Sequence, residues 1–448
     1  MQALNLSSKA RRTQEQPINA LIVAALGNPK LINLAAGLVD FETLPVGELA
    51  SAASVVLGSE ARGRAALQYE TTQGYSELRR LAMIHLEELE GKPSGEMGLS
   101  ADDFVVTTGS QQALYLIGDV LIDPGDIVIA ANPSYFVYTG TLTSFGANVL
   151  AVPADENGMD VEAVEQLLAR LDREGRLSRV KMVYCTSYFD NPTGRTLAQE
   201  RRGRLVEIVK SYSRQHRILI LEDAAYRELR YDGEALPSIK SFDKDNSHTI
   251  IACTFSKPFA PGIKLGYTAM PRDLMHAVLQ QKGNHDFGSP SLCQHLAAEV
   301  MKDRLYEKQV AKLKANYQKK RDIMLAALER HMPKDPHISW TKPGGGLYVW
   351  LTLPERVDTR GVGIMFSMCV ERGVLYVPGD HAYQPDESGR IPTNHLRLCF
   401  GSVPTDAIEP GVERLAGVVK ELLSAAESNG VNSQVEAVNA ALPKEVVF

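Results

Sequence analysis

Short apolar runs alternate with longer amphipathic stretches through the middle of the chain. The runs are rich in Val, Ile and Leu and are bounded by turn residues, which is typical of buried strands. They cover residues 104–107, 127–130, 148–152, 181–185, 217–221, 249–253 and 265–269. Between them, apolar residues recur at helical spacing in 111–121, 160–171, 198–215 and 271–282. Strands that alternate with helices predict a mostly parallel seven-stranded sheet covered on both faces, a three-layer α/β/α domain.

The pattern changes after residue 289. One helical pattern extends to residue 331, which is too long for a typical globular helix and indicates two helices or one bent helix. Strands at 347–351, 373–377 and 396–400, around helices at 359–372 and 406–426, then predict a smaller α+β domain. We expect an N-terminal segment (1–50) docked on the small domain, a large domain (51–318), the small domain (319–430) and a polar tail (431–448).

Composition and charge exclude several classes of protein. The chain has 448 residues, of which 44% are hydrophobic and 23% charged, as in ordinary globular proteins. A net charge of -6 argues against a nucleic-acid partner, and no apolar stretch approaches the roughly 20 residues that span a membrane. The start of the chain does not resemble a secretory signal. Five scattered cysteines favour reduced thiols in a cytoplasm, and no metal-ligand spacing predicts a metal site.

Polar residues follow four of the predicted strands, where ligands bind in parallel sheets. After 104–107, Gly109-Ser110-Gln111 opens a helix, so its backbone N–H groups can bind an anion, or Ser110 can simply cap the helix. After 181–185, Asn191-Pro192-Thr193-Gly194 is a turn, which either holds the Asn191 amide for a ligand or is only a turn. Each signal is weak when it is taken alone.

A carboxylate and a lysine follow the next two strands. Asp223 ends an apolar strand, where a charge is costly without a partner, and Tyr226 lies three residues further on. Lys257 follows the hydroxyl residues Thr254 and Ser256; it is either an ordinary surface lysine or a desolvated, nucleophilic one. Together these features fit one ligand that has a phosphate, an aldehyde, a phenolic oxygen and a basic ring nitrogen, namely pyridoxal phosphate.

The same motifs resemble those of the class I/II aminotransferases, which are pyridoxal-phosphate enzymes of fold type I. The resemblance extends from about residue 32 to 423. It rests on Ser256-Lys257 with Pro261-Gly262-x-x-x-Gly266, Asn191-Pro192-Thr193-Gly194, Asp223-x-x-Tyr226, Gln68-Tyr69 with Gly74-Tyr75, Pro343-Gly344-Gly345-Gly346, and Asn394-His395-Leu396-Arg397. This chain departs from the usual pattern at Lys264, where the family usually has arginine.

The resemblance implies roles for individual residues. Lys257 would bond covalently to the cofactor aldehyde and move the substrate proton, with Asp223 and Tyr226 as the other catalytic residues. Arg397 would bind the substrate carboxylate, with Asn191 and the backbone of Gly37 nearby. The implied cofactor-binding residues are Ser110, Gln111, Tyr135, Asn191, Asp223, Tyr226, Thr254, Ser256, Lys257, Lys264 and, from a neighbouring subunit, Tyr69.

The implied activity is transfer of an amino group from an L-amino acid to a 2-oxo acid, 2-oxoglutarate being the expected acceptor, by a ping-pong mechanism in a homodimer with shared active sites. Two alternatives remain open. A lyase, a cyclising synthase or another non-transaminating enzyme would use the same fold and cofactor. A transcription regulator built on this fold would carry an N-terminal winged helix, and we expect the roughly thirty residues before Leu34 to be too few for one.

Overall fold

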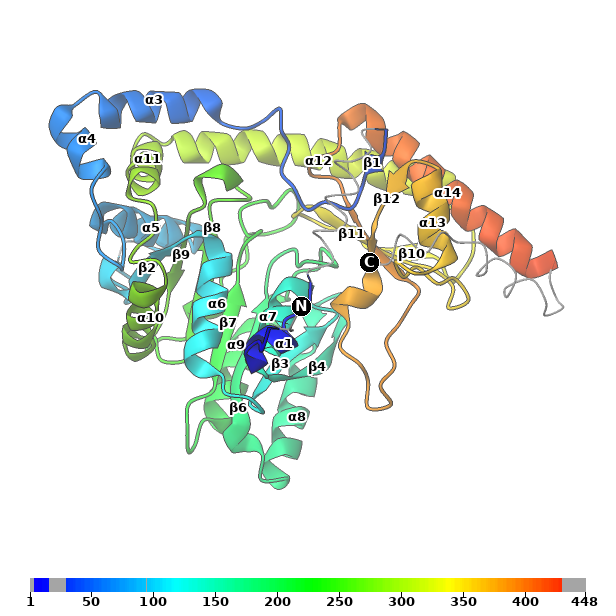
Figure 1. The fold of residues 1–448 in the computed structure, drawn as a ribbon, viewed down its shortest axis with the longest axis horizontal. Helices are drawn as coiled ribbons and strands as arrows, with labels where there is room; N and C mark the ends of the chain where they lie inside the picture. The colour runs from blue at the N-terminus through cyan, green and yellow to red at the C-terminus, as the bar shows by residue number, and fades with distance from the viewer. Residues whose placement is uncertain (1–3, 16–29, 94, 429–448) are drawn as a thin grey trace.

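The computed structural model describes residues 4–15, 30–93 and 95–428 (Figure 1). Its centre is an eight-stranded sheet in the order β2-β9-β8-β7-β6-β3-β4-β5. Strands β3, β4, β6, β7 and β8 run parallel, whereas β9 and β5 are antiparallel to their neighbours. The strand bounds are β2 Phe104–Thr107, β3 Ile127–Asn132, β4 Asn148–Asp155, β5 Gly158–Met159, β6 Val180–Thr186, β7 Leu219–Asp223, β8 Thr249–Thr254 and β9 Gly266–Ala269. The predicted α/β fold is confirmed, and the eighth strand is the short hairpin partner β5.

Helices cover both faces of this sheet because successive strand residues point to opposite sides. Val128 and Ala130 of β3 pack with helices α6 (Gly109–Leu121), α7 (Phe136–Phe145) and α10 (Arg272–His285). Ile127 and Ile129 pack on the other face with α8 (Val161–Arg173) and α9 (Gln199–Tyr212). The continuous apolar runs of the sequence are therefore strands buried on both faces.

Helix α8 illustrates why these residues form a helix. The Asp160 side chain caps it by accepting a hydrogen bond from the N–H of Ala163 at 3.0 Å. Buried apolar residues then recur three or four positions apart and form one stripe along the helix. They are Val161, Val164, Leu167, Leu168 and Leu171.

A second, antiparallel sheet forms the C-terminal part, in the order β10-β11-β14-β13. Its strands are β10 Ser339–Trp340, β11 Tyr348–Thr352, β13 Val377–Pro378 and β14 His395–Cys399, and its helices are α13 Ile364–Glu371 and α14 Thr405–Ser428. The strand predicted at 373–377 is divided, because β12 (Val374–Leu375) pairs with β1 (Ile32–Asn33) while β13 pairs with β14. The helix predicted at 359–372 was wrong at its start, 359–363: Gly363 is the N-cap of α13, and Thr359 bonds to Thr393 instead.

The long helical pattern is two helices. Helix α11 (Ser291–Lys302) ends before Arg304, whose backbone has the left-handed φ of 57°, and α12 (Leu305–His331) follows. In Figure 1, α12 runs along the top of the molecule from the large sheet to the small one. The boundary expected at 318 lies inside this helix, and the domain limits remain a prediction. The predicted tail, 431–448, lies outside the described residues.

The segment before the large sheet contacts both parts of the fold. Its helices are α1 (Ser8–Arg12), α3 (Val46–Leu57), α4 (Glu60–Ala66) and α5 (Ser76–Leu89), which the apolar pattern did not predict. Asp40 bonds to Lys320 of α12, and Leu34 accepts a hydrogen bond from the backbone of Cys399 at 2.7 Å. This contact places residues 35–37 beside β14. Within the part of the chain that the structure describes, no helix is both long and apolar enough to cross a membrane.

Candidate active site

A cavity of about 250 Å³ lies where β6, β7 and β8 end and α6 begins. Ten of the predicted site residues line it, although they come from six separate stretches of the chain. They are Ser110, Gln111, Tyr135, Asn191, Asp223, Tyr226, Thr254, Ser256, Lys257 and Lys264. The carboxyl ends of parallel strands meet at one edge of a sheet, which is why residues far apart in the sequence converge here.

Lys257 is a partly buried lysine whose amine has a depressed pKa. Its Nζ donates a hydrogen bond to the carbonyl oxygen of Gly37 at 2.7 Å. Burial, together with the positive charges of Arg397 and Lys264, lowers the pKa of Lys257 to about 8. A side chain of this kind is neutral, and therefore nucleophilic, in a large fraction of molecules slightly above neutral pH. The alternative of an ordinary surface lysine does not fit this environment.

Asp223 is buried at the end of β7. Its Oδ2 accepts a hydrogen bond from the hydroxyl of Tyr184 at 3.0 Å, and its Oδ1 accepts one from the N–H of Ala225 at 3.2 Å. Burial raises the pKa of Asp223 to about 6 despite these two donors. Such a carboxylate is stabilised by a cation placed beside it, which a protonated pyridine nitrogen would provide.

Asn191 and Arg397 form one hydrogen-bonded unit. Arg397 donates from one terminal nitrogen to Asn191 Oδ1 at 2.7 Å and from the other to the carbonyl of Ala35 at 2.8 Å. Arg397 is 2% exposed, its guanidinium carbon lies 4.4 Å from the ring centre of Tyr348, and its Nε has no hydrogen-bond partner among the described residues. Because Asn191 uses its oxygen as an acceptor, its amide N–H groups remain to donate to a ligand.

The turn that holds Asn191 is locked by its neighbour Asp190. Oδ1 of Asp190 accepts hydrogen bonds from the N–H of Thr193 at 3.0 Å and from the N–H of Arg195 at 3.1 Å. Gly194 adopts a φ of 70°, and a Cβ there would come within 2.7 Å of the Tyr348 carbonyl oxygen. The Asn191-Pro192-Thr193-Gly194 motif is therefore more than a simple turn, because it holds the Asn191 side chain at the cavity and in contact with Arg397.

The rim beside α6 carries the groups expected to hold an anion. Thr108, not Ser110, is the N-cap of α6 and makes no side-chain cap, so the alternative role of Ser110 as the cap is wrong. The hydroxyl of Thr254 donates to Ser256 Oγ at 3.0 Å, and the Lys264 amine faces the same cavity. A Cβ on Gly266 would come within 2.8 Å of the Ser110 nitrogen, so glycine permits the close approach of β9 to the helix start. Two hydroxyls, free helix N–H groups and an amine suit a phosphate.

Three predicted residues lie outside the cavity lining, namely Arg397, which contacts Asn191 as described above, Gly37 and Tyr69. Gly37 contacts the site through its carbonyl at Lys257, and a Cβ there would come within 2.4 Å of the Tyr348 hydroxyl. Tyr69 is 83% exposed, and its ring lies 6.1 Å from that of Phe287. The role expected for Tyr69 at a neighbouring subunit therefore stays a prediction.

The sequence analysis missed two tyrosines that hold the catalytic candidates in place. Tyr184 bonds to Asp223, and the hydroxyl of Tyr348 lies 2.9 Å from that of Tyr226. Both are inside predicted strands, where an aromatic residue is expected in the core. The one sequence feature that could have indicated their role is the tyrosine hydroxyl, because a buried hydroxyl needs a hydrogen-bond partner.

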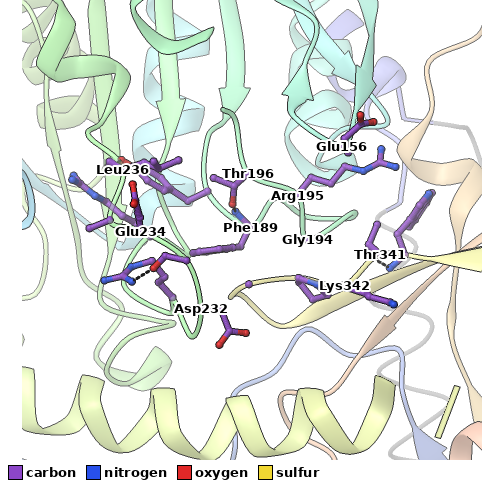
Figure 2. A pocket seen from close by; sticks show the side chains of 18 of the residues that line it. Glu156, Phe189, Gly194, Arg195, Thr196, Asp232, Glu234, Leu236, Thr341 and Lys342 are labelled. Carbon is purple, nitrogen blue, oxygen red and sulfur yellow. Dashed lines mark hydrogen bonds between the residues drawn. The ribbon is translucent and has the colours of Figure 1, made fainter. Parts of the chain in front are cut away.

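A larger cavity of about 690 Å³ lies between the two sheets, on the other side of the Asn191 turn. Figure 2 shows Phe189, Arg195 and Lys342 around it. None of the predicted site residues lines this cavity. The candidate active site is therefore defined by its chemistry and not by its volume.

Comparison with known proteins identifies the class that this fold and site define. The family described as aminotransferase class I and II matches residues 29–415. Aromatic-amino-acid aminotransferase 1 of Thermococcus litoralis is 37% identical over 87% of this chain and 88% of its own length. The 2-aminoadipate transaminase of Thermus thermophilus is 31% identical over 93% and 96%. A kynurenine aminotransferase of Pyrococcus horikoshii, solved in complex with PMP, has a TM-score of 0.84 at 33% identity and covers 94% of this chain and 98% of its own.

The chain belongs to the class I and II aminotransferase family. It is a pyridoxal-phosphate-dependent transaminase, as the resemblance implied, and the matches favour neither a lyase nor a cyclising synthase.

Proposed function

We propose that the cavity beside Lys257 holds pyridoxal phosphate and that the enzyme transfers the amino group of an L-amino acid to a 2-oxo acid. The observation that carries the proposal is that Lys257, whose pKa is lowered to about 8, lines the same cavity as the buried carboxylate of Asp223. The relative solved with PMP, the amine form of this cofactor, supports the same reading.

The residues that line the cavity fit both the phosphate and the ring of the cofactor. Ser110, Gln111, Thr254, Ser256 and Lys264 would hold the phosphate, with Lys264 acting as a point charge where an arginine fork is usual. The remaining ring-facing residues have matching roles: Tyr135 would stack on the ring, Asp223 would pair with the ring nitrogen, and Asn191 and Tyr226 would donate to the phenolic oxygen.

When bound, the cofactor supplies an aldehyde that condenses with amines and a ring that delocalises the electron pair left when the substrate Cα loses its proton. Lys257 would take that proton as a general base, since its neutral amine lies inside the cavity. Asp223 would keep the ring nitrogen protonated, and Tyr184 would hold the Asp223 carboxylate in place. The surrounding burial excludes water, which strengthens both interactions.

Arg397 would bind the substrate carboxylate. Its fork is already oriented by Asn191 and Ala35, and its Nε has no partner among the described residues, so N–H groups remain for a second acceptor. The same contacts would fix the angle between the Cα–H bond and the ring, which is an orientation effect.

Arg397→Lys is expected to weaken binding of the amino acid, because a lysine cannot make the two-pronged contact. Disrupting a buried charged pair costs about 2–5 kcal/mol, so KM should rise at least about 30-fold. Steady-state kinetics with an amino acid and with the corresponding amine, which lacks the carboxylate, check this. An equal loss for both substrates would contradict the assigned contact.

We propose aromatic and long-chain amino acids as donors, with 2-oxoglutarate as the acceptor. The basis is the names of the relatives, which act on aromatic amino acids, 2-aminoadipate and kynurenine. To test this, each amino acid of a panel is mixed with the holoenzyme in the absence of an acceptor, and the absorbance spectrum of the cofactor is followed. Conversion to the amine form supports transamination, whereas release of ammonia and retention of the aldehyde form would indicate a lyase.

We further propose a cytoplasmic homodimer. Tyr69 and Phe287 are both more than two-thirds exposed, and their rings lie 6.1 Å apart at the surface. A second copy would cover these residues and bring Tyr69 to the neighbouring cavity. The mass of the holoenzyme in solution tests the dimer. The cofactor affinity of Tyr69→Phe tests whether Tyr69 contacts the cofactor of the neighbouring subunit.

A further inference from the structure

A second group of polar side chains lies away from the active site, where helix α5 meets the start of α12. His85 and Glu88 are one turn apart on α5, and Glu307 is in the first turn of α12. One ring nitrogen of His85 and one carboxylate oxygen from each glutamate lie within 4.8 Å of one another. None of these residues lines the cavity beside Lys257.

Glu228, itself held by Tyr306, fixes the orientation of the His85 ring. Its Nε2 lies 2.9 Å from Glu228 Oε2, and the hydroxyl of Tyr306 donates to Glu228 Oε1 at 2.6 Å. A carboxylate at Nε2 favours the tautomer with its proton on that nitrogen, which leaves the lone pair on Nδ1. A carboxylate–histidine arrangement of this kind commonly supports histidines that bind metals.

Two atoms of the group lack partners. His85 is 6% exposed, and its Nδ1 is buried with no hydrogen-bond partner among the described residues. Glu307 Oε2 is also buried and has no partner within the same part of the chain. Unsatisfied buried polar atoms are costly, so their convergence indicates that something else binds them.

Arg304 lies beside the two carboxylates. One of its terminal nitrogens is 3.1 Å from Glu88 Oε1 and 3.1 Å from Glu307 Oε1. Its side chain is 60% exposed and can swing into solvent, and it leaves Glu307 Oε2 and His85 Nδ1 unused. Arg304 is therefore a competitor that a more highly charged cation can displace.

We propose that His85 Nδ1, Glu88 and Glu307 bind a divalent transition-metal ion such as Mn²⁺, Co²⁺ or Zn²⁺, with Glu228 and Tyr306 as the supporting outer residues. One imidazole and two carboxylates suit these ions, and water would complete the coordination. The sequence predicted no metal because Glu307 is more than 200 positions from His85 and approaches it only in the fold. The ion would join α5 to the long helix α12. This inference is independent of the proposed amino-transfer site.

The experiment titrates holoenzyme with Mn²⁺ and measures free ion by electron paramagnetic resonance. Wild type is expected to bind one ion, Glu88→Gln to bind at least about tenfold more weakly, and Arg304→Gln to bind more tightly because the competing cation is gone. Glu88 is exposed, so its substitution leaves the fold intact. Glu409→Gln is the matched control, because Glu409 contacts a histidine and an arginine but belongs to no metal-binding group among the described residues. Wild-type binding weaker than about 1 mM, or equal binding by Glu88→Gln, would overturn the site.

Discussion

Lys257→Ala is expected to lose transamination by at least about 10³-fold, since one substitution removes both the nucleophile and the general base. The variant should still bind the cofactor through the phosphate rim, because Ser110, Thr254, Ser256 and Lys264 are unchanged. Single-turnover kinetics with a reactive donor measure the loss, and equilibrium dialysis measures the retained cofactor.

Lys240 provides a matched control for this experiment. It is a second buried lysine whose pKa is lowered by burial to about 8, but it bonds to the carbonyl of Thr249, away from the cavity. Borohydride treatment of holoenzyme followed by peptide mapping should find the cofactor fixed to Lys257 and none on Lys240. Label on another lysine, or near-normal turnover by Lys257→Ala, would refute the assigned role.

The depressed pKa of Lys257 also predicts a pH dependence. Only the neutral amine attacks an aldehyde, and with a pKa of about 8 the neutral fraction rises as pH approaches 8 and levels off above it. The rate at which cofactor-free protein captures pyridoxal phosphate should follow the same curve. Stopped-flow absorbance between pH 6 and about 10 measures it. A rise that begins only near the ordinary lysine value would show that burial does not act as inferred.

Asp223→Asn is the second substitution with a large expected effect. The amide keeps the shape of the side chain but lacks the charge that would hold a proton on the ring nitrogen. Removing one member of a buried charge pair costs about 3–5 kcal/mol, which corresponds to a fall in kcat of about 10²–10⁴-fold. Half-reaction rates and the pH dependence of the cofactor absorbance together check this expectation.

Two further variants separate charge from structure. Tyr184→Phe removes one hydrogen bond to Asp223 and should reduce kcat much less than Asp223→Asn does. Glu222→Gln alters the adjacent buried carboxylate, which bonds to Ser187 and to the backbone of Ile239 and so should affect unfolding rather than kcat. A kcat for Asp223→Asn within a few-fold of wild type would exclude the ring-nitrogen role.

Much of the fold and of the candidate site could be predicted from the local sequence. Apolar runs at residues 104–107 and 249–253 agree with β2 and β8 to within one residue, because strands buried on both faces need continuous apolar side chains. The helix predicted at 359–372 failed over 359–363, because Thr359 is held by Thr393, which lies 34 positions further along the chain. Helices α3, α4 and α5, which the apolar pattern did not predict, pack on α11, and most helices in proteins draw their stability from such tertiary packing.

The order of polar residues after the strands was enough to predict which side chains could bind a phosphate, which could pair with a ring nitrogen, and which lysine could bond to the aldehyde. It was enough because parallel strands bring their carboxyl ends to one edge. Only the tertiary structure decided how those groups are held: Tyr184 on Asp223, Tyr348 beside Tyr226, and Gly37 on Lys257. These contacts join residues up to 220 positions apart, and the depressed pKa of Lys257 is likewise a product of burial that no spacing along the chain encodes.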